Sequence, residues 1–296
     1  MKNRNPLIAG IMSIMFLGLG QLYNGQLRKA IIFAFSIIPI CFLIGFSGLL
    51  KCFKGLIISM FLVLGYIAFV LLDSVKWAYK QNDYELKKVN SIKYYVAFIV
   101  GWYILIFLLP FAVKSITGYE TFEISTPSME PSIKAGDRIM ATVIKPQNLK
   151  IGDIITFTRE DGQKYLSRAM GLPGQKIEII DNKVSINDIA EKWEEIEKIE
   201  LDEYHYQIFN SVLPSGRVIG TQKMLTYNNI NIPEQEISNL KSMIIPKNQI
   251  YVIGDNRNNS MDSRMYGAIS FDQIEKQVHY VWWSNDKSRI GKSLDE

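Results

Sequence analysis

Only two cysteines and two histidines occur among the 296 residues of this chain. Cys41 and Cys52 lie in or beside apolar runs and no cysteine follows them, which excludes a disulfide-stapled secreted domain and a cysteine-rich zinc site. His205 and His279 alone are too few ligands for a histidine-based metal centre. The sequence therefore predicts no metal site.

The chain also lacks a strong excess of charge, with 33 Lys and Arg against 29 Asp and Glu. Residues 1–113 hold 11 Lys and Arg but only 3 Asp and Glu, whereas acidic residues outnumber basic ones, 26 to 22, in the remainder. The isoelectric point of about 8.8 thus reflects the first part of the chain alone. It is no evidence for nucleic-acid binding, and we expect no nucleic-acid partner.

Long apolar runs, by contrast, dominate the first 113 residues. Four stretches without a charged side chain, 6–23, 30–50, 55–72 and 94–113, approach the length of about 20 residues that a helix needs to cross a bilayer. The first is no cleaved signal peptide, because further apolar stretches follow it and no A-x-A-like site ends it. The pattern predicts a membrane region over 1–113 with about four transmembrane helices, which excludes a soluble cytoplasmic protein.

The basic residues of the predicted loops indicate an orientation. Seven Lys and Arg lie after the first and third stretches, against four before the first and after the second. Cytoplasmic loops carry the excess of Lys and Arg, so the seven are expected in the cytoplasm. With four spans, both termini then face outward, and everything after Val113 is exported.

A glycine-rich phrase, Gly18-Leu-Gly-Gln-Leu-Tyr-Asn-Gly25, follows the first apolar stretch. We interpret it as a tight hairpin between two spans; a contact with a partner helix is the alternative, because small residues let helices approach closely. Asp73, just after the third stretch, is interpreted as a residue at the membrane interface.

From Ile124 onward the apolar runs become short and alternate with turn residues such as Gly-Asp and Pro-Gly. This pattern is typical of a mainly-β domain, and we predict one over 114–296, with a more polar subdomain inserted at about 182–247. Predicted strands include 138–144, 151–158, 176–180, 249–253 and 277–283.

Three phrases in this domain stand out: Ser125-Thr-Pro-Ser-Met-Glu-Pro-Ser132, Tyr165-Leu-Ser-Arg-Ala-Met-Gly-Leu-Pro-Gly174 and Gly254-Asp-Asn-Arg-Asn-Asn-Ser-Met-Asp-Ser-Arg-Met-Tyr-Gly267. Each alone is compatible with an ordinary turn or polar loop. Together, in this order and behind apolar spans, they resemble the type I signal peptidases, membrane-anchored serine endopeptidases of the Ser-Lys kind. The resemblance covers nearly all of 122–296.

The resemblance implies a role for each matching residue. Ser128 matches the nucleophile, which forms an acyl-enzyme, and the Ser128 backbone N–H and the Thr126 hydroxyl match the oxyanion hole. Ser260 matches a serine that orients the general base. No cofactor or metal is implied, since the chemistry needs only side chains and water. The positions matching supporting residues, with a salt-bridged group formed by the two arginines and Asp262, are Met129, Pro131, Arg168, Gly254, Asp262 and Arg264.

Ser167 breaks the pattern, because it stands where the bacterial family has its general-base lysine. A buried lysine has a lowered pKa and can accept a proton, whereas a serine hydroxyl has no comparably basic lone pair. Lys164 is near in sequence, but three residues along a strand place it on the opposite face from Ser167. Gln175, where the family usually has an aspartate, is a second and milder departure from the family pattern.

Two functions therefore stay open. The first is an active signal peptidase that cleaves exported preproteins after small residues, held in the bacterial cytoplasmic membrane as a multi-pass protein with its catalytic domain on the outer face. The second is a catalytically silent homologue that binds signal peptides or an active peptidase without turnover. The partners expected from the resemblance are signal peptides, the lipid bilayer and the secretion machinery.

Overall fold

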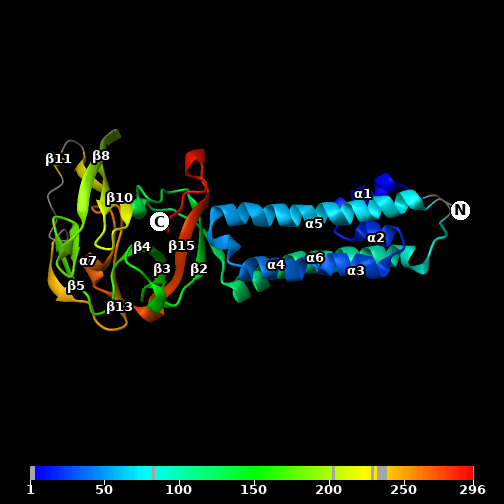
Figure 1. The fold of residues 1–296 in the computed structure, drawn as a ribbon, viewed down its shortest axis with the longest axis horizontal. Helices are drawn as coiled ribbons and strands as arrows, with labels where there is room; N and C mark the ends of the chain where they lie inside the picture. Colours follow the sequence, from blue (N-terminus) through cyan, green and yellow to red (C-terminus); the bar gives the residue numbers. More distant parts are fainter. Residues whose placement is uncertain (1–3, 82–83, 202–203, 228–229, 232–238, 296) are drawn as a thin grey trace. The chain divides into compact units, whose positions relative to one another are not determined.

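The computed structural model describes residues 4–81, 84–201, 204–227, 230–231 and 239–295. The chain divides into two compact units. The first comprises Met1–Leu50 and Lys54–Tyr119, and the second comprises Lys51–Phe53 and Glu120–Glu296. The first unit is helical and the second is mainly β (Figure 1).

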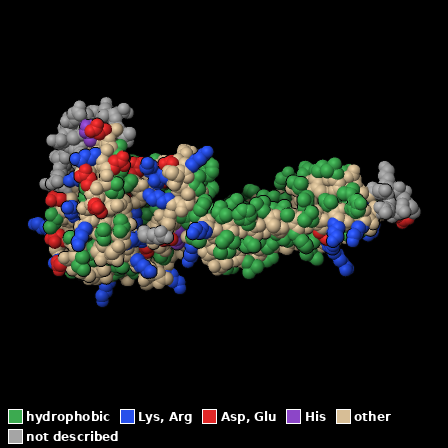
Figure 2. Space-filling model, turned by 45° about the horizontal axis from the view of Figure 1, so that its top comes forward, with side chains coloured by type: hydrophobic (Ala, Val, Ile, Leu, Met, Phe, Trp, Pro, Cys, Tyr) green, Lys and Arg blue, Asp and Glu red, His purple; other side chains and the backbone are tan. Residues whose placement is uncertain are grey.

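Six α-helices make up the described part of the helical unit: α1 (Pro6–Met15), α2 (Leu19–Tyr23), α3 (Leu27–Phe35), α4 (Ile37–Phe46), α5 (Phe53–Lys80) and α6 (Ile92–Thr117). Three segments are long and apolar enough to cross a membrane: Leu27–Phe46, Phe53–Lys80 and Ile92–Thr117. Hydrophobic side chains cover this unit in the view of Figure 2. Many are exposed, as at Phe107 (68%) and Leu72 (63%), which is the surface expected of helices that face lipid.

The stretch 6–23, predicted as the first span, is not one continuous helix. It forms α1 and α2, and the chain turns between them at Gly18, whose φ is +97°. The glycine-rich phrase is therefore α2 itself, flanked by two glycines of positive φ, Gly18 and Gly25. In the described residues three helical segments, not four, thus have the length of a span. Asp73, predicted at the end of a span, lies within α5, where it pairs with Lys29 at 3.0 Å.

The second unit is built around a seven-stranded sheet with the order β1-β2-β15-β3-β4-β13-β14, all neighbours being antiparallel. The strands β5 and β13 have the bounds predicted from their runs of Ile, Val and Tyr. A helical membrane region followed by a mainly-β domain confirms the predicted fold class. The strands of this sheet are β1 (Glu120–Glu123), β2 (Arg138–Val143), β3 (Ile154–Thr158), β4 (Lys164–Gly171), β13 (Gln249–Ile253), β14 (Ile269–Ser270) and β15 (Ile274–Trp283).

Two four-stranded sheets contain the described part of the predicted insertion at 182–247. One sheet has the order β12-β5-β6-β7, with β5 (Lys176–Ile180), β6 (Lys183–Ile186), β7 (Ile189–Ala190) and β12 (Leu240–Ile244). The other has the order β11-β10-β9-β8, with β8 (Lys192–Leu201), β9 (Tyr204–Val212), β10 (Val218–Tyr227) and β11 (Ile230–Asn231). In chain order this segment lies between β5 and β13.

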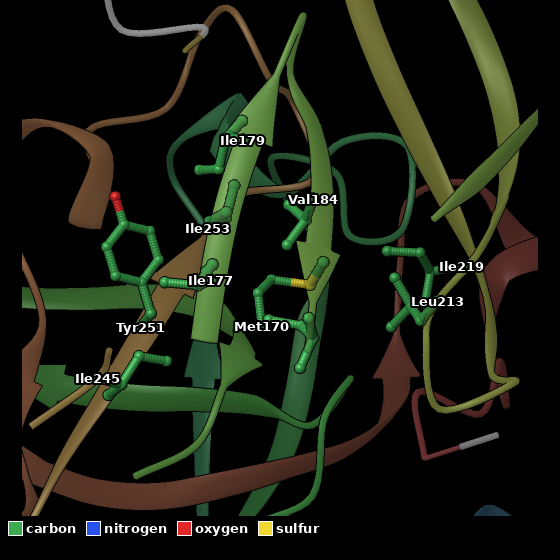
Figure 3. Close-up of a cluster of buried hydrophobic side chains, with 10 residues drawn as sticks. Met170, Ile177, Ile179, Val184, Leu213, Ile219, Ile245, Tyr251 and Ile253 are labelled. Carbon is green, nitrogen blue, oxygen red and sulfur yellow. The ribbon is translucent and has the colours of Figure 1, made fainter. Parts of the chain in front are cut away.

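A cluster of buried side chains joins the small sheets to the central one (Figure 3). Met170 of β4 and Ile253 of β13 pack there with Ile177 of β5 and Val184 of β6. Each such side chain stabilises the fold by roughly 1.5–3 kcal/mol on burial. The cluster therefore fixes β4 and β13 beside each other; β4 carries most of the second sequence phrase, and β13 leads directly into the third.

Candidate active site

Ser128 lies on a short turn that hydrophobic packing holds in place. The turn is a 3-10 helix, Pro127–Met129, and Met129 is fully buried in a cluster with Ile133 and Ile139. The N–H of Ile133 donates to the Met129 carbonyl at 2.9 Å, which closes the turn. Burial of Met129 thus anchors the turn, while the neighbouring Ser128 stays half-buried at its surface.

The hydroxyls of Thr126 and Ser128 lie 3.2 Å apart. Both residues line a groove of about 600 Å³. A hydroxyl beside a nucleophilic oxygen can donate a hydrogen bond to the charge that develops on an attacked carbonyl. The structure thus brings together the two side chains that the sequence assigned to the nucleophile and the oxyanion hole.

The groove lies between two segments of extended or turning backbone. One wall is β1 with the residues that follow it, and the other is the first half of β4. Its lining is apolar over much of its length, so it suits an extended peptide with apolar side chains. The residues that line it are Phe122, Glu123, Ile124, Ser125, Thr126, Pro127, Ser128, Ile139, Thr156, Gln163, Lys164, Tyr165, Leu166, Asn259 and Met261.

Gly254 lies where only a glycine fits. A Cβ atom at this position would lie 2.1 Å from the Ser260 Oγ and 2.7 Å from the Ser128 carbonyl oxygen. The backbone continues along the same turn, since the N–H of Asn256 donates to the Ser128 carbonyl at 3.1 Å. The third sequence phrase therefore packs directly against the turn that carries Ser128.

Two separate buried ion pairs support this wall. Arg264 donates to Asp262 (2.7 Å), and Asp262 in turn accepts from the backbone N–H of Gly254 (2.9 Å). Arg168 instead donates to Asp255 (2.8 Å) and to the Gly152 carbonyl (2.6 Å). The prediction that Arg168 shares one group with Asp262 and Arg264 is corrected here, because the partner of Arg168 is Asp255.

The turn after Ser128 has supports that the sequence reasoning missed. Arg168 also donates to the Ser132 hydroxyl (3.2 Å), and Arg289 donates to the Ser132 carbonyl (2.9 Å). Arg289 is paired with Asp137 as well. Burial alone would raise the pKa of Asp137. Hydrogen bonds from Arg289 and from the backbone of Lys134 outweigh this effect and hold that pKa below its usual value. Only two sequence signals pointed to these supports. Asp255 directly follows Gly254 in the third phrase, and Arg289 lies in the C-terminal part of the segment that resembles the signal peptidases.

Comparison with known proteins places the chain in a family. The family model described as signal peptidase, peptidase S26, matches residues 93–283. The chain belongs to this signal peptidase family. The match runs from α6 to the end of β15, and α1 to α5 lie outside it.

Curated signal peptidases are identical to this chain at about a third of the aligned residues. The Signal peptidase I of Rickettsia typhi is 31% identical over 183 residues, covering 59% of this chain and 64% of the relative. That of Rickettsia prowazekii is 32% identical over 142 residues (45% and 52%), and Signal peptidase IB of Staphylococcus aureus is 29% identical over 195 residues (65% and 85%). The chain thus spans between half and two thirds of the length of the Rickettsia relatives.

A solved signal peptidase I from Enterococcus faecalis is 24% identical to this chain. The comparison covers 43% of this chain and 93% of that one, with a TM-score of 0.26.

Ser167, which the resemblance predicts to stand at the general-base position, is buried in β4 with 1% of its surface exposed. In the part of the chain that the structure describes, no hydrogen bond joins its hydroxyl to Ser128 or Ser260. The buried Ser260 hydroxyl has no hydrogen-bond partner there either. The site thus contains an unpartnered hydroxyl at Ser260, the residue predicted to orient a base.

Lys164 is an amine on the groove wall, while Ser167 does not line the groove. The Lys164 Nζ donates to the Glu275 carboxylate at 2.8 Å. Burial opposes ionisation of Glu275, but hydrogen bonds from Lys164 and Thr158 outweigh it and lower the pKa of this carboxyl. The Lys164 amine is thus engaged in an ion pair with Glu275.

Within the described ranges, no three His, Cys, Asp or Glu side chains lie close enough together to hold a metal ion.

Proposed function

We propose that this chain is a membrane-bound serine endopeptidase that removes signal peptides from exported preproteins. It acts in the bacterial cytoplasmic membrane with the β unit on the outer face. The observation that carries the proposal is the pair of hydroxyls of Ser128 and Thr126, 3.2 Å apart on the wall of a groove suited to an extended peptide. Membership of the signal peptidase family supports the same reaction.

In the proposed reaction the groove holds the end of a signal peptide in an extended conformation, with small side chains in shallow pockets. The Ser128 oxygen attacks the scissile carbonyl carbon, and the Thr126 hydroxyl donates to the oxygen on which negative charge develops. Collapse of this intermediate breaks the C–N bond, the proton lost by Ser128 passes to the leaving nitrogen, and the mature protein departs as an amine while an ester remains on Ser128. Water then hydrolyses the ester and regenerates the serine.

The anchoring of the enzyme suits such a substrate. Ser128 follows the end of α6 by eleven residues, a reach of at most about 40 Å even if fully extended. The bilayer and the secretion machinery are the partners that this position favours.

The first step needs an acceptor for the Ser128 proton, and this is where the chain departs from its family. The Ser167 hydroxyl is far too weak a base at neutral pH, and the Lys164 amine is engaged by the Glu275 carboxylate. Loss of general-base help typically slows a reaction by about 10²–10⁴-fold. We therefore expect turnover that is slow compared with a site that carries an amine at position 167.

A second candidate function is a silent homologue that binds signal peptides, or an active peptidase, without cleavage. The unpartnered hydroxyl of Ser260 and the small, buried side chain of Ser167 favour it, because both are consistent with a base that has been lost from an otherwise intact site. The groove and the nucleophile are shared by both proposals, which differ only in turnover.

A cleavage assay with the purified full chain and a preprotein that carries an A-x-A site separates the two. The variants are Ser128→Ala, Ser167→Lys and the double variant, compared with the unaltered chain. Slow processing by the unaltered chain that disappears in Ser128→Ala supports the peptidase. Cleavage by Ser167→Lys alone supports the silent homologue, and cleavage by none of the variants contradicts the assignment of Ser128 as the nucleophile of a site that lacks only its base.

A further inference from the structure

The first two helices form a hairpin whose ends meet. The backbone N–H of Asn5, just before α1, donates to the Tyr23 hydroxyl at the end of α2 (3.2 Å), and the Arg4 guanidinium lies 4.4 Å from the centre of the Tyr23 ring. A continuous helix over 6–23 would separate its ends by about 27 Å, since each residue rises 1.5 Å. The chain therefore returns to the end from which it started.

Two glycines make the return possible. Gly18 has a φ of +97°, a conformation that other residues rarely adopt, and it lies between the two helices. Gly20 lets α2 pack closely against α1, because a Cβ there would lie 2.1 Å from the Ser13 Oγ and 2.3 Å from the Ala9 carbonyl oxygen. The hairpin is thus specified by the glycine-rich phrase.

Buried polar side chains attach the hairpin to one end of α5. The hydroxyls of Ser13 and Ser74 lie 2.9 Å apart, and Gln21 donates to the Val70 carbonyl at 2.8 Å. Asn24 donates to the Ser74 carbonyl, also at 2.8 Å. Hydrogen bonds between helices are favoured where water is excluded, and all of these lie in the second half of α5, towards the end where Figure 1 shows α1 and α2.

The same end of the helical unit carries the loop between α5 and α6. The Arg4 guanidinium also lies 4.0 Å from the centre of the Tyr84 ring. Asn90, just before α6, donates to the carbonyls of Leu22 (3.2 Å) and Tyr23 (3.0 Å). The chain at Arg4 is thus on the same side of this unit as the residues that follow α5.

We propose that residues 4–26 are a re-entrant hairpin, which enters and leaves the bilayer on the cytoplasmic side and does not cross it. The ten residues of α1 span about 15 Å, half of the hydrocarbon thickness. Exposed apolar side chains such as Leu7 (70%) and Ile14 (70%) face lipid along this depth. The N-terminus is then cytoplasmic, in place of the outward position predicted from four spans.

The distribution of basic residues agrees with this arrangement. Lys2 and Arg4 join the seven Lys and Arg of the predicted cytoplasmic loops, so nine cations are assigned to that side, and three, Lys51, Lys54 and Lys114, are assigned to the opposite ends of the spans. Three spans from a cytoplasmic N-terminus leave the β unit on the outer face, as four spans from an outward N-terminus would. The proposal thus changes the topology of the N-terminus alone and does not depend on the enzymatic activity.

Labelling with a membrane-impermeant maleimide tests the side on which the N-terminus lies. In cells that express the full chain with Cys41→Ser, native Cys52 is exposed in the loop between α4 and α5 and serves as the external control. Lys2→Cys and Lys88→Cys are introduced singly after Cys52→Ser. We expect Cys52 to react in intact cells, and both introduced cysteines to react only after the membrane is opened. Reaction of Lys2→Cys in intact cells would overturn the proposal.

Cross-linking in membranes tests the hairpin itself. In a chain without native cysteines, Ser13→Cys paired with Ser74→Cys is expected to form a disulfide under mild oxidation, because the two hydroxyls are 2.9 Å apart. The matched control pairs Ser13→Cys with Ser59→Cys, fifteen residues or about 22 Å away along α5. A first helix that crossed the membrane would bring Ser13 nearer to the depth of Ser59. A disulfide to position 59, or none to position 74, contradicts the hairpin.

Discussion

Removal of the Asp255 carboxylate should destabilise the β unit strongly, because it leaves a buried guanidinium without its counter-charge. The side chains of Arg168 and Asp255 are only 3% and 1% exposed, so water cannot replace the lost partner. Breaking one side of such a buried pair typically costs about 3–5 kcal/mol. We therefore expect Asp255→Ala to lower the free energy of unfolding by about this amount.

The corresponding shift can be measured by thermal unfolding followed by near-ultraviolet circular dichroism. For a domain of this size each kcal/mol lowers the midpoint by about 2–4 °C, so the shift should be roughly 6–20 °C. Glu123→Gln is the matched control, because its partner Arg138 is 46% exposed and Glu123 is 61% exposed. Exposed pairs contribute at most about 1 kcal/mol. Equal, small shifts for both variants would refute the argument that burial makes the Arg168 pair important.

Three further predictions concern other parts of the chain. Gly254→Ala should abolish peptide cleavage and lower the unfolding midpoint, because its Cβ would lie 2.1 Å from the Ser260 Oγ; a fully active variant contradicts the close packing. Asp137 has a lowered pKa when folded, so its contribution to stability is present above the ordinary value of 3.8 and is lost as the pH falls through the folded-state pKa; Asp137→Asn should flatten this acid dependence in urea unfolding, and an unchanged pH profile contradicts it. Gly20→Val should weaken the cross-link between positions 13 and 74, since the side chain has no space beside Ala9; undiminished cross-linking contradicts the tight hairpin.

The sequence predicted the architecture because the architecture depends on local patterns. Short runs of Ile, Val and Tyr between turn residues located β5 and β13. The three phrases pointed to Ser128, Thr126 and Gly254, whose catalytic and supporting roles stay predictions. Hydropathy averages, however, do not register the single positive-φ glycine that divides the first apolar stretch, so 6–23 was expected to be one span. The physical signal was Gly18 together with Gln21 and Asn24, polar side chains that need partners inside a membrane.

The partner of Arg168 could not be chosen from sequence, since both Asp255 and Asp262 lie in the same phrase. The choice depends on the pairing of two strands, in which Ile253 of β13 lies opposite Arg168 of β4. That register brings Asp255 to the guanidinium and leaves Asp262 to Arg264. Lys164 illustrates the same limit: its position on the groove wall follows from the strand face, but its ion pair with Glu275 depends on a strand far away in sequence.

The most direct test of the account is the rate at which Ser167→Lys cleaves a preprotein, compared with the unaltered chain. If Ser128 is the nucleophile in a complete groove that lacks only a base, this substitution should raise the rate by about 10²–10⁴-fold, and Ser128→Ala should remove the activity of the improved enzyme. A rate that Ser167→Lys leaves unchanged, or that survives Ser128→Ala, would contradict the account.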